Sequence, residues 1–245
     1  MINIFRKIRK QLANDNKPIK YMRYAFGEII LVVIGILIAL QINSWNKDRI
    51  AKIEEKQILK NLHNEFQQNE YLLNEVVDIN VRCFNTGVIV MGLFGKERSE
   101  IAKYNIDSLI FFSLEKRLFS PSENALQDLF QSGRYQLISN DDLKKSLYQW
   151  SQKMLSAKER YSGMDSKIEL DIVPYLSKNY SFKDIDKNGP LNWESKSILK
   201  IDKLRIFHDI EYENNVDDLL YRINDYRNDL IDLQSIIKRI LKETE

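Results

Sequence analysis

The stretch "GEIILVVIGILIALQINSWN", residues 27–46, decides the architecture of this chain. It contains an apolar run from Ile29 to Leu40. By length alone, such a run suits a membrane span, the core of a cleaved signal sequence, or a buried helix of a soluble protein. The residues that flank the run therefore have to distinguish the three.

The flanks favour a membrane span. Tyr24 and Trp45 bracket the run and are 21 residues apart, which is about 31 Å of helix at about 1.5 Å per residue. The hydrocarbon core of a bilayer is about 30 Å thick, and Tyr and Trp prefer its two interfaces. The sequence "LQINSW" that follows the run offers no small-residue cleavage site. We therefore predict an uncleaved signal anchor at 24–45, with the lipid bilayer as its partner.

The charge distribution predicts the orientation of this anchor. Residues 1–23 carry seven Lys or Arg side chains against the single carboxylate of Asp15, a net charge of +6, whereas the whole chain has a net charge of +2. Basic residues close to a span remain on the cytoplasmic side. We therefore expect residues 1–23 to be a basic cytoplasmic segment and residues 46–245 to be a domain outside the cytoplasm.

The basic segment also has a helical pattern. Its apolar residues recur three or four positions apart, with basic residues between them: Met1, Ile4, Phe5, Ile8 and Leu12. One interpretation is an amphipathic helix that lies on an anionic leaflet, and the other is a plain topology signal. The sequence "NDNKP" at 14–18 is expected to end this helix before the span.

The exported part is predicted to be all-α. The chain has only eight Gly and four Pro residues, which favours helices over a turn-rich β-sandwich. From residue 45 to about residue 90 a continuous helix is expected, so that the transmembrane helix continues into an extracytoplasmic helical bundle. Its apolar residues follow a spacing of three or four, interrupted by Asn69 and Asn80: Leu59, Leu62, Phe66, Leu73, Val76 and Cys83. Gly92 and Gly95 are expected to end it.

Further helices are predicted from capping signals. A short helix is expected around 109–112. Ser120 with Glu123 resembles a capping box, and Gly133 is the residue type that ends a helix in the left-handed conformation. An extended link at 134–138 and a second capping box, Ser139 with Asp142, come next. Another helix is expected at about 151–173, ended or kinked by Pro174, and residues 180–200 are expected to form a surface loop.

The most regular pattern lies in the last helix, predicted at 216–241. Its apolar residues alternate at spacings of three and four: Val216, Leu219, Ile223, Tyr226, Leu230, Leu233, Ile237 and Ile240. Such a seam is typical of a coiled coil or of a helical bundle. The two alternatives are packing on the 45–90 helix within one chain and a separate dimeric coil.

The residue types that carry chemistry are sparse. Cys83 is the single cysteine, so the chain has no internal disulfide or cysteine-cluster metal site, and its position on the apolar stripe predicts burial. His63 is expected to be solvated. His208, close to acidic side chains from Asp209 to Glu213, fits either a loose cation site or the charge complement of a helix N-terminus. The acidic pairs at 141–142 and 217–218 are expected in the first turns of helices, where their charges would complement the helix N-terminus.

We therefore predict no catalytic residues, no cofactor and no metal site. The chain lacks a glycine-rich phosphate loop, a G-x-S-x-G elbow and an H-E-x-x-H helix. Trp193 is either an exposed contact residue or an anchor for its loop. No nucleic-acid partner is expected, because the basic residues gather in the cytoplasmic segment and the helix pair around Gly133 has no basic cluster in its turn.

Three stretches together resemble a known family: "FRKIRKQL", "YAFGEIILVVIGILIALQINSWN" and "LQDLFQSGRYQLISNDDLKKSL". They are similar to a family of uncharacterised single-pass membrane proteins from Bacteroidota, which carries a domain-of-unknown-function label. The resemblance implies an inner-membrane protein with a periplasmic helical body. It supplies no activity, cofactor or site residue.

One stripe of the span is a candidate for helix packing. At about 100° per residue, Glu28, Gly35, Ala39 and Asn46 fall on the same side of the helix. Gly35 and Ala39 have the spacing that lets two transmembrane helices approach closely, which would pair this helix with itself or with another membrane protein. The alternative places Glu28 at the inner interface near Arg23, with its carboxylate in water.

Two hypotheses about function follow. In the first, the periplasmic domain is a protein-interaction or sensing module tethered to the membrane. In the second, it is a membrane-anchored enzyme with a carboxylate-lined active site, for which a carboxylate of raised pKa in a deep pocket would be the expected sign.

Overall fold

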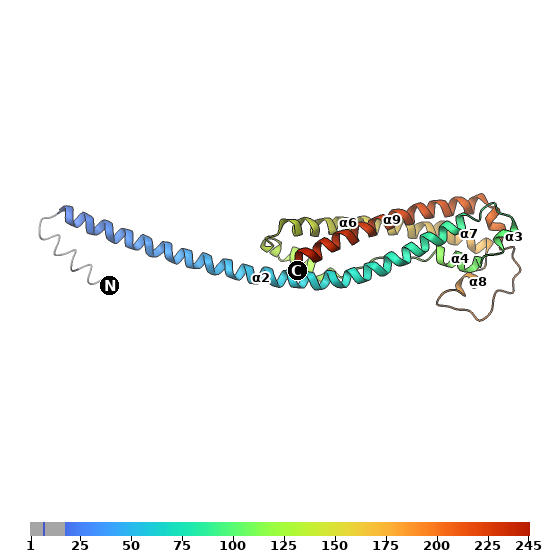
Figure 1. Ribbon diagram of the computed structural model, residues 1–245, viewed down its shortest axis with the longest axis horizontal. Coiled ribbons are helices and arrows are strands. Elements are labelled where there is room, and N and C mark those ends of the chain that lie inside the picture. The colour runs from blue at the N-terminus through green and yellow to red at the C-terminus, as the bar shows by residue number, and fades with distance from the viewer. Residues whose placement is uncertain (1–6, 8–17) are drawn as a thin grey trace. The chain divides into compact units, whose positions relative to one another are not determined.

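The computed structural model describes Lys7 and residues 18–245. Its elements are α2 (Pro18–Met91), α3 (Arg98–Ile101), α4 (Ile106–Ser113), α5 (Asn124–Gln131), η1 (Arg134–Leu137), α6 (Asp141–Lys167), η2 (Ile168–Ile172), α7 (Val173–Asn179), α8 (Phe182–Asp186), η3 (Arg205–His208) and α9 (Ile210–Thr244). None of these described elements is a strand, which confirms the all-α prediction (Figure 1). The amphipathic helix predicted before residue 13 lies, Lys7 apart, outside the described residues.

The chain divides into two units, residues 1–56 and 57–245, and α2 contributes to both. In the first unit, every residue from 29 to 50 is exposed. The helical stretch that begins at Ala25 reaches a mean hydropathy of 2.5 with none of that window buried, so it is long and apolar enough to cross a membrane. It is one such helix among the described residues, and its position near the N-terminus matches the predicted span.

In the second unit, α2 buries one apolar stripe. The predicted residues Leu62, Phe66, Leu73, Val76 and Cys83 are all buried. Leu59 is only half-buried, and the neighbouring Ile58 is buried in its place. The helix ends at Met91, and Gly95 takes a φ of 71°, as the glycines after residue 90 predicted.

The seam of α9 is the centre of this unit. All eight residues of the predicted 3–4 pattern are buried within the chain. Helix α9 packs most extensively on α6 and also touches α2, where the Arg227 guanidinium lies 4.5 Å from the centre of the Phe84 ring. Gly87 allows close approach there, because a Cβ atom at this position would lie 2.8 Å from Leu220 Cδ2. The seam thus belongs to an intramolecular bundle, with α6 as a partner that the pattern did not reveal.

The helix boundary predicted near residue 151 is wrong. Helical structure continues from Asp141 to Asn179 through α6, η2 and α7. Pro174 lacks an N–H and its ring crowds the carbonyl four residues earlier. That carbonyl lies in the π-helical turn η2, directly before α7, where the backbone hydrogen bonds are spaced differently from those of an α-helix. The helix therefore passes Pro174 without ending.

The turn between α5 and α6 was predicted only in part. Gly133 adopts a φ of 73° and ends α5, as expected. The segment that follows is the 3₁₀ turn η1 rather than an extended link. The N-cap of α6 is Asn140 and not Ser139, because the Asn140 Oδ1 accepts hydrogen bonds from Asp142 N at 2.9 Å and Leu143 N at 3.1 Å.

Residues 114–123, which we call the strap, form the non-helical connection between α4 and α5. A helix start at Ser120 was predicted here and is wrong, since α5 begins at Asn124. The cap of α5 comes instead from the buried Glu65 on α2, which accepts hydrogen bonds from Ala125 N at 2.8 Å and Leu126 N at 3.3 Å.

Other buried side chains hold the backbone of the strap. Asn69 donates to Ser122 O at 2.7 Å and accepts from Ser122 N at 2.9 Å. The Tyr226 hydroxyl accepts from Phe119 N at 2.9 Å and donates to Arg117 O at 3.3 Å. These polar side chains within apolar stripes therefore form hydrogen bonds with backbone N–H and C=O groups of the strap, which lies outside any helix.

Candidate functional site

The most unusual surface of the 57–245 unit is the segment 187–203 between α8 and η3, which we call the apolar loop. Five large apolar side chains on it are exposed to solvent: Leu191 (59%), Trp193 (44%), Ile198 (93%), Leu199 (75%) and Ile201 (39%). Singly exposed apolar residues are normal on a protein surface. Five within the eleven residues 191–201, on a segment without regular structure, are characteristic of a contact surface.

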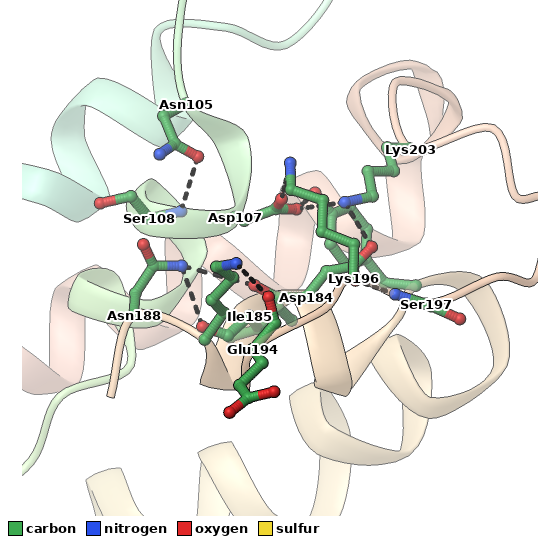
Figure 2. A network of polar contacts seen from close by, with 12 residues as sticks. Asn105, Asp107, Ser108, Asp184, Ile185, Asn188, Glu194, Lys196, Ser197 and Lys203 are labelled. Atoms are coloured by element: carbon green, nitrogen blue, oxygen red, sulfur yellow. Dashed lines mark hydrogen bonds and ion pairs between the residues drawn. The ribbon is translucent and has the colours of Figure 1, made fainter. Parts of the chain in front are cut away.

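Two buried carboxylates lie beneath the base of this loop. Asp107 is on α4 and Asp184 is on α8, and both are buried. Lys203, at the end of the loop, places its Nζ 2.6 Å from Asp107 Oδ1 and 2.6 Å from Asp184 Oδ2 (Figure 2). One ammonium group thus joins two helices to the loop.

Further hydrogen bonds complete this network. The buried Tyr180 hydroxyl donates to Asp107 Oδ1 at 2.7 Å, and Ser197 N donates to Asp184 Oδ1 at 2.7 Å. Lys196 places its Nζ 3.4 Å from Asp107 Oδ2. Lys196 and Ser197, directly before Ile198, are therefore tied to the two buried carboxylates, as is Lys203 further along the loop.

The network fixes the charge state of its members. Burial alone would raise the pKa of Asp107 and of Asp184, but hydrogen bonds from Lys203 to both, from Tyr180 to Asp107 and from Ser197 N to Asp184 bring each pKa below its usual value. Burial lowers the pKa of Lys203, and the two carboxylates outweigh it and raise that pKa. Burial and Asp107 raise the pKa of the Tyr180 hydroxyl. At neutral pH Asp107 and Asp184 are therefore carboxylates and Lys203 is an ammonium.

Packing and local bonds also shape the loop. A Cβ atom at Gly189 would lie 2.4 Å from Phe111 Cε2, so only glycine lets the chain pass this ring on α4. Lys187 Nζ donates to Glu194 O at 3.1 Å, and Lys183 Nζ donates to Ser195 Oγ at 3.1 Å. The base of the loop is thus held by packing and ionic contacts while its apolar side chains face solvent.

The charged groups of this site pair with one another. Its carboxylates have lowered pKa values and already accept from Lys203, whereas a carboxyl that serves as a general acid needs a raised pKa. Among the described residues, no group of His, Cys, Asp and Glu side chains has the arrangement of a metal site. The features that remain without an internal partner are the exposed apolar side chains.

A shallow groove between α6 and α9 is the other notable surface. It encloses about 460 Å³ and is lined in part by Tyr148, Lys153 and Asp232. Lys153 Nζ lies 2.8 Å from Asp232 Oδ2 and 3.1 Å from Asp229 Oδ1. Lys153 of α6 thus pairs with two carboxylates of α9.

The structure places the predicted intramembrane stripe on α2. Gly35 and Ala39 are exposed, and a Cβ atom at Gly35 would meet no other atom within 4 Å. Glu28 is half-buried on the same helix. A close approach of a second helix at Gly35 is therefore sterically open, and the pairing itself stays a prediction.

The two histidines lie in different settings. His63 was expected to be solvated but is half-buried, with its Nδ1 3.1 Å from Thr244 Oγ1. His208 is exposed. Its neighbour Asp209 caps α9 by accepting from Glu211 N at 2.9 Å and also accepts from the Tyr175 hydroxyl at 2.7 Å. The acidic residues after His208 thus complement a helix N-terminus, which was one of the two predicted alternatives.

The remaining predicted residues serve the fold or the surface. Cys83 is buried, as expected, and burial raises the pKa of its thiol to about 12. The acidic pair at 141–142 lies in the first turn of α6. The pair at 217–218 does not lie in a first turn, because α9 already begins at Ile210, and Asp218 pairs with Arg222 and Lys167. Trp193 is exposed in the apolar loop, as one of its two interpretations required.

Sequence reasoning missed the network beneath the loop. Asp107 and Lys203 are 96 residues apart, and neither stands in a recognisable motif. A weak signal was present, since residues 191–201 combine five apolar or aromatic residues with no helical or strand periodicity.

Residues 28–90 match the model of a family described as Family of unknown function (DUF6090). The match covers the apolar run of the first unit and the buried stripe of α2. No curated protein and no solved structure matches the chain.

Proposed function

We propose that this chain is a single-pass inner-membrane protein whose domain outside the cytoplasm binds a partner through the apolar loop. Residues 24–45 are its uncleaved signal anchor, residues 1–23 stay in the cytoplasm, and residues 46–245 form a periplasmic helical domain. The apolar helix that begins at Ala25 supports the anchor, and the basic excess before it supports this orientation.

One observation carries the binding role. The apolar loop keeps Ile198 and Leu199 in solvent, while residues beside them are fixed to Asp107 and Asp184 in the interior. A loop that served only to connect α8 to η3 would need no exposed apolar side chains. It would also need no buried ion pairs, since burying charges is itself unfavourable. A surface held in one conformation loses less entropy when it binds.

The enzyme alternative finds no comparable support. The buried carboxylates Asp107 and Asp184 have lowered pKa values, the opposite of the sign that this hypothesis requires.

Site-specific photo-crosslinking in native membranes tests the binding role. A photoreactive residue replaces Ile198 in the full chain, and the matched control replaces Leu155, which is 60% exposed on α6. We expect adducts from position 198 and none from position 155. Equal yields at both positions, or no adduct at position 198, would contradict the proposal.

The orientation and the anchor have their own tests. A reporter that is active only outside the cytoplasm should be active when fused after Glu245, and the mature protein should retain its first 40 residues. A mature N-terminus near Gln41 would identify a cleaved signal instead.

We also propose that the stripe of Glu28, Gly35 and Ala39 pairs the span with a second transmembrane helix. Single cysteines placed along 31–42 in a Cys83→Ala background test self-pairing by disulfide crosslinking. A maximum at positions 35, 39 and 42 is expected, and uniform crosslinking would contradict self-pairing.

A further inference from the structure

We propose that the 57–245 unit has a binding site for a short uncharged saccharide, in a polar hollow between α2 and the start of α5. The hollow encloses about 410 Å³ and shares no lining residue with the apolar loop. Ligand sites generally enclose about 300–1,000 Å³. Amide side chains line much of it: Asn61, Asn64, Gln68 and Asn124.

The amides give the hollow its chemistry. Asn61, Asn64 and Gln68 are spaced three and four residues apart on one side of α2, and Asn124 joins them from the first turn of α5. Within the described part of the chain, the side chains of Asn64 and Gln68 form no hydrogen bond. The Asn61 Oδ1 accepts from Gln57 Nε2 at 2.8 Å, which leaves its Nδ2 to a ligand. An amide offers both donors and an acceptor, so a set of amides matches the donors and acceptors of neighbouring hydroxyl groups.

The stability of α2 does not account for these amides. Exposed helix positions are best filled by residues of high helix propensity such as Lys, Glu or Ala. Asn is a poorer helix former, because its side chain competes for the hydrogen bonds of nearby backbone groups. Asn61 and Asn64 are nevertheless exposed in the interior of α2. They therefore lower the helix propensity of this segment without adding to its packing.

The charges of the hollow are already used by the fold. Glu65 accepts from Ala125 N and Leu126 N, and Asp128 pairs with Arg134. None of the residues that line the hollow is basic. An ionic ligand would therefore find no unpaired charge of opposite sign, which favours an uncharged ligand.

Hydrogen bonds beneath the hollow hold its walls in place. Asn69 donates to Ser122 O and accepts from Ser122 N, and the Ser122 hydroxyl donates to Glu65 Oε2 at 3.2 Å. These contacts fix the strap and the start of α5 against α2. A site whose walls are already fixed loses less conformational entropy on binding.

An exposed aromatic ring borders the amides. Tyr71 is 68% exposed and comes three residues after Gln68 on the same side of α2. Its hydroxyl donates to Glu75 Oε1 at 3.4 Å. A tyrosine ring offers an apolar surface for packing. A sugar ring has apolar C–H faces as well as hydroxyl groups, so it can use the Tyr71 ring and the amides together.

Saturation-transfer difference NMR tests the proposal on the full chain in a sugar-free detergent. The probes are maltotriose and the trimer of N-acetylglucosamine, with trigalacturonic acid as an anionic comparison and a tetraalanine with blocked ends as a peptide comparison. We expect transfer to at least one of the two neutral trisaccharides and none to the two comparisons. Transfer to neither neutral trisaccharide, or stronger transfer to either comparison, would overturn the proposal.

Two sets of variants locate the bound saccharide. Asn64→Ala with Gln68→Ala should weaken binding about tenfold or more, because two amides that bond hydroxyl groups are removed. Asn85→Ala, which removes an exposed amide elsewhere on α2, should bind as the parent does. Ala has a higher helix propensity than Asn or Gln, so the double variant should unfold at a urea concentration no lower than the parent. Equal binding by the parent and the double variant would overturn the proposal.

The apolar loop provides a separate comparison. Ile198→Ser with Leu199→Ser should bind the saccharide as the parent does, because the two sites share no residue. Unchanged saccharide binding in this variant supports a site that is independent of the loop, whatever position 198 crosslinks to. Loss of saccharide binding would place the saccharide at the loop and overturn the assignment to the hollow.

Discussion

Ile237 in α9 and Ile198 in the apolar loop are the same side chain in opposite environments. Ile237 is fully buried, whereas Ile198 is 93% exposed. The first belongs to a seam whose members are spaced three and four residues apart and are all buried. The second belongs to a segment without any period, and no packing of the 57–245 unit requires it to be apolar.

This comparison separates folding from binding. Apolar residues of the seam are accounted for by the stability of the bundle, so their substitution should change stability and leave the surface of the folded protein unchanged. Apolar residues of the loop are not accounted for in this way, so their substitution should change binding alone. Lys203 lies between the two classes, because it is a loop residue with buried partners.

The largest effect is expected in the seam. Leu230 is fully buried in the middle of α9, and Leu230→Asp would bury a charge without a partner. We expect a loss of about 5 kcal/mol in the free energy of unfolding, enough to unfold the domain. Urea denaturation of the detergent-solubilised full chain, followed by the fluorescence of buried Trp150, measures it.

The control for this variant is the next residue along the chain. Ile231 is 45% exposed, so Ile231→Asp should change stability by less than about 1 kcal/mol. If Leu230→Asp unfolds at the same urea concentration as the parent, the seam is not the core of the bundle.

The next largest effect is expected for Lys203→Met, which leaves Asp107 and Asp184 buried without their shared ammonium. Removing one partner of a buried ion pair is generally destabilising by 3–5 kcal/mol. We expect about 3 kcal/mol here, because Lys196 remains near Asp107. The same urea titration measures it, and Lys200→Met on the exposed part of the loop should match the parent.

Acid should act through the same network. The pKa values of Asp107 and Asp184 are lowered in the folded protein from the usual value of 3.8. The two carboxylates therefore contribute fully to the free energy of unfolding above that value. This contribution is lost as the pH falls below it and through the lowered pKa values of the folded protein. We expect the parent to lose stability more steeply than Asp184→Asn between about pH 5 and pH 2. Parallel curves in acid urea titrations would contradict this.

A smaller effect is expected at the cap of α5. Glu65→Ala would leave the buried N–H groups of Ala125 and Leu126 without their acceptor, which we expect to reduce stability by about 2 kcal/mol. Asp78→Ala, an exposed carboxylate on the same helix, should change stability by less than about 0.5 kcal/mol. Equal urea midpoints for the two variants would show that the carboxylate does not act as a cap.

The smallest effect on stability is expected in the loop. Ile198→Ser with Leu199→Ser should change the free energy of unfolding by less than about 0.5 kcal/mol, because both side chains are already in water. A loss of several kcal/mol would mean that these side chains are buried in solution, and the comparison with Ile237 would no longer hold.

The sequence predicted those parts of the fold that follow from local patterns. The seam of α9 and the stripe of α2 are visible as periods, and the glycine turn at Gly133 is visible as a residue type. Distant partners were not visible. The cap at α5 was assigned to Ser120, whereas it comes from Glu65, about 60 residues earlier, and no local pattern records that contact.

The candidate site was less predictable for the same reason. An irregular surface segment containing Trp193 was expected, but its anchor joins Asp107, Asp184 and Lys203 from three separate parts of the chain. Each of them alone is an ordinary charged residue. Their burial follows from the packing of α4 against α8, which depends on the tertiary structure.

The strap also determines the order in which the domain can assemble. Its backbone partners are Asn69 on one side and Tyr226 on the other, and Tyr226 is separated from Phe119 by 107 residues. A contact between residues this far apart closes a long loop of chain. Such contacts form slowly, because the chain loses conformational entropy on closing the loop before the contact stabilises it. In a chain that is synthesised from its N-terminus, Glu65 and Asn69 are therefore present early, but the strap cannot be sealed until α9, the last helix, has been made.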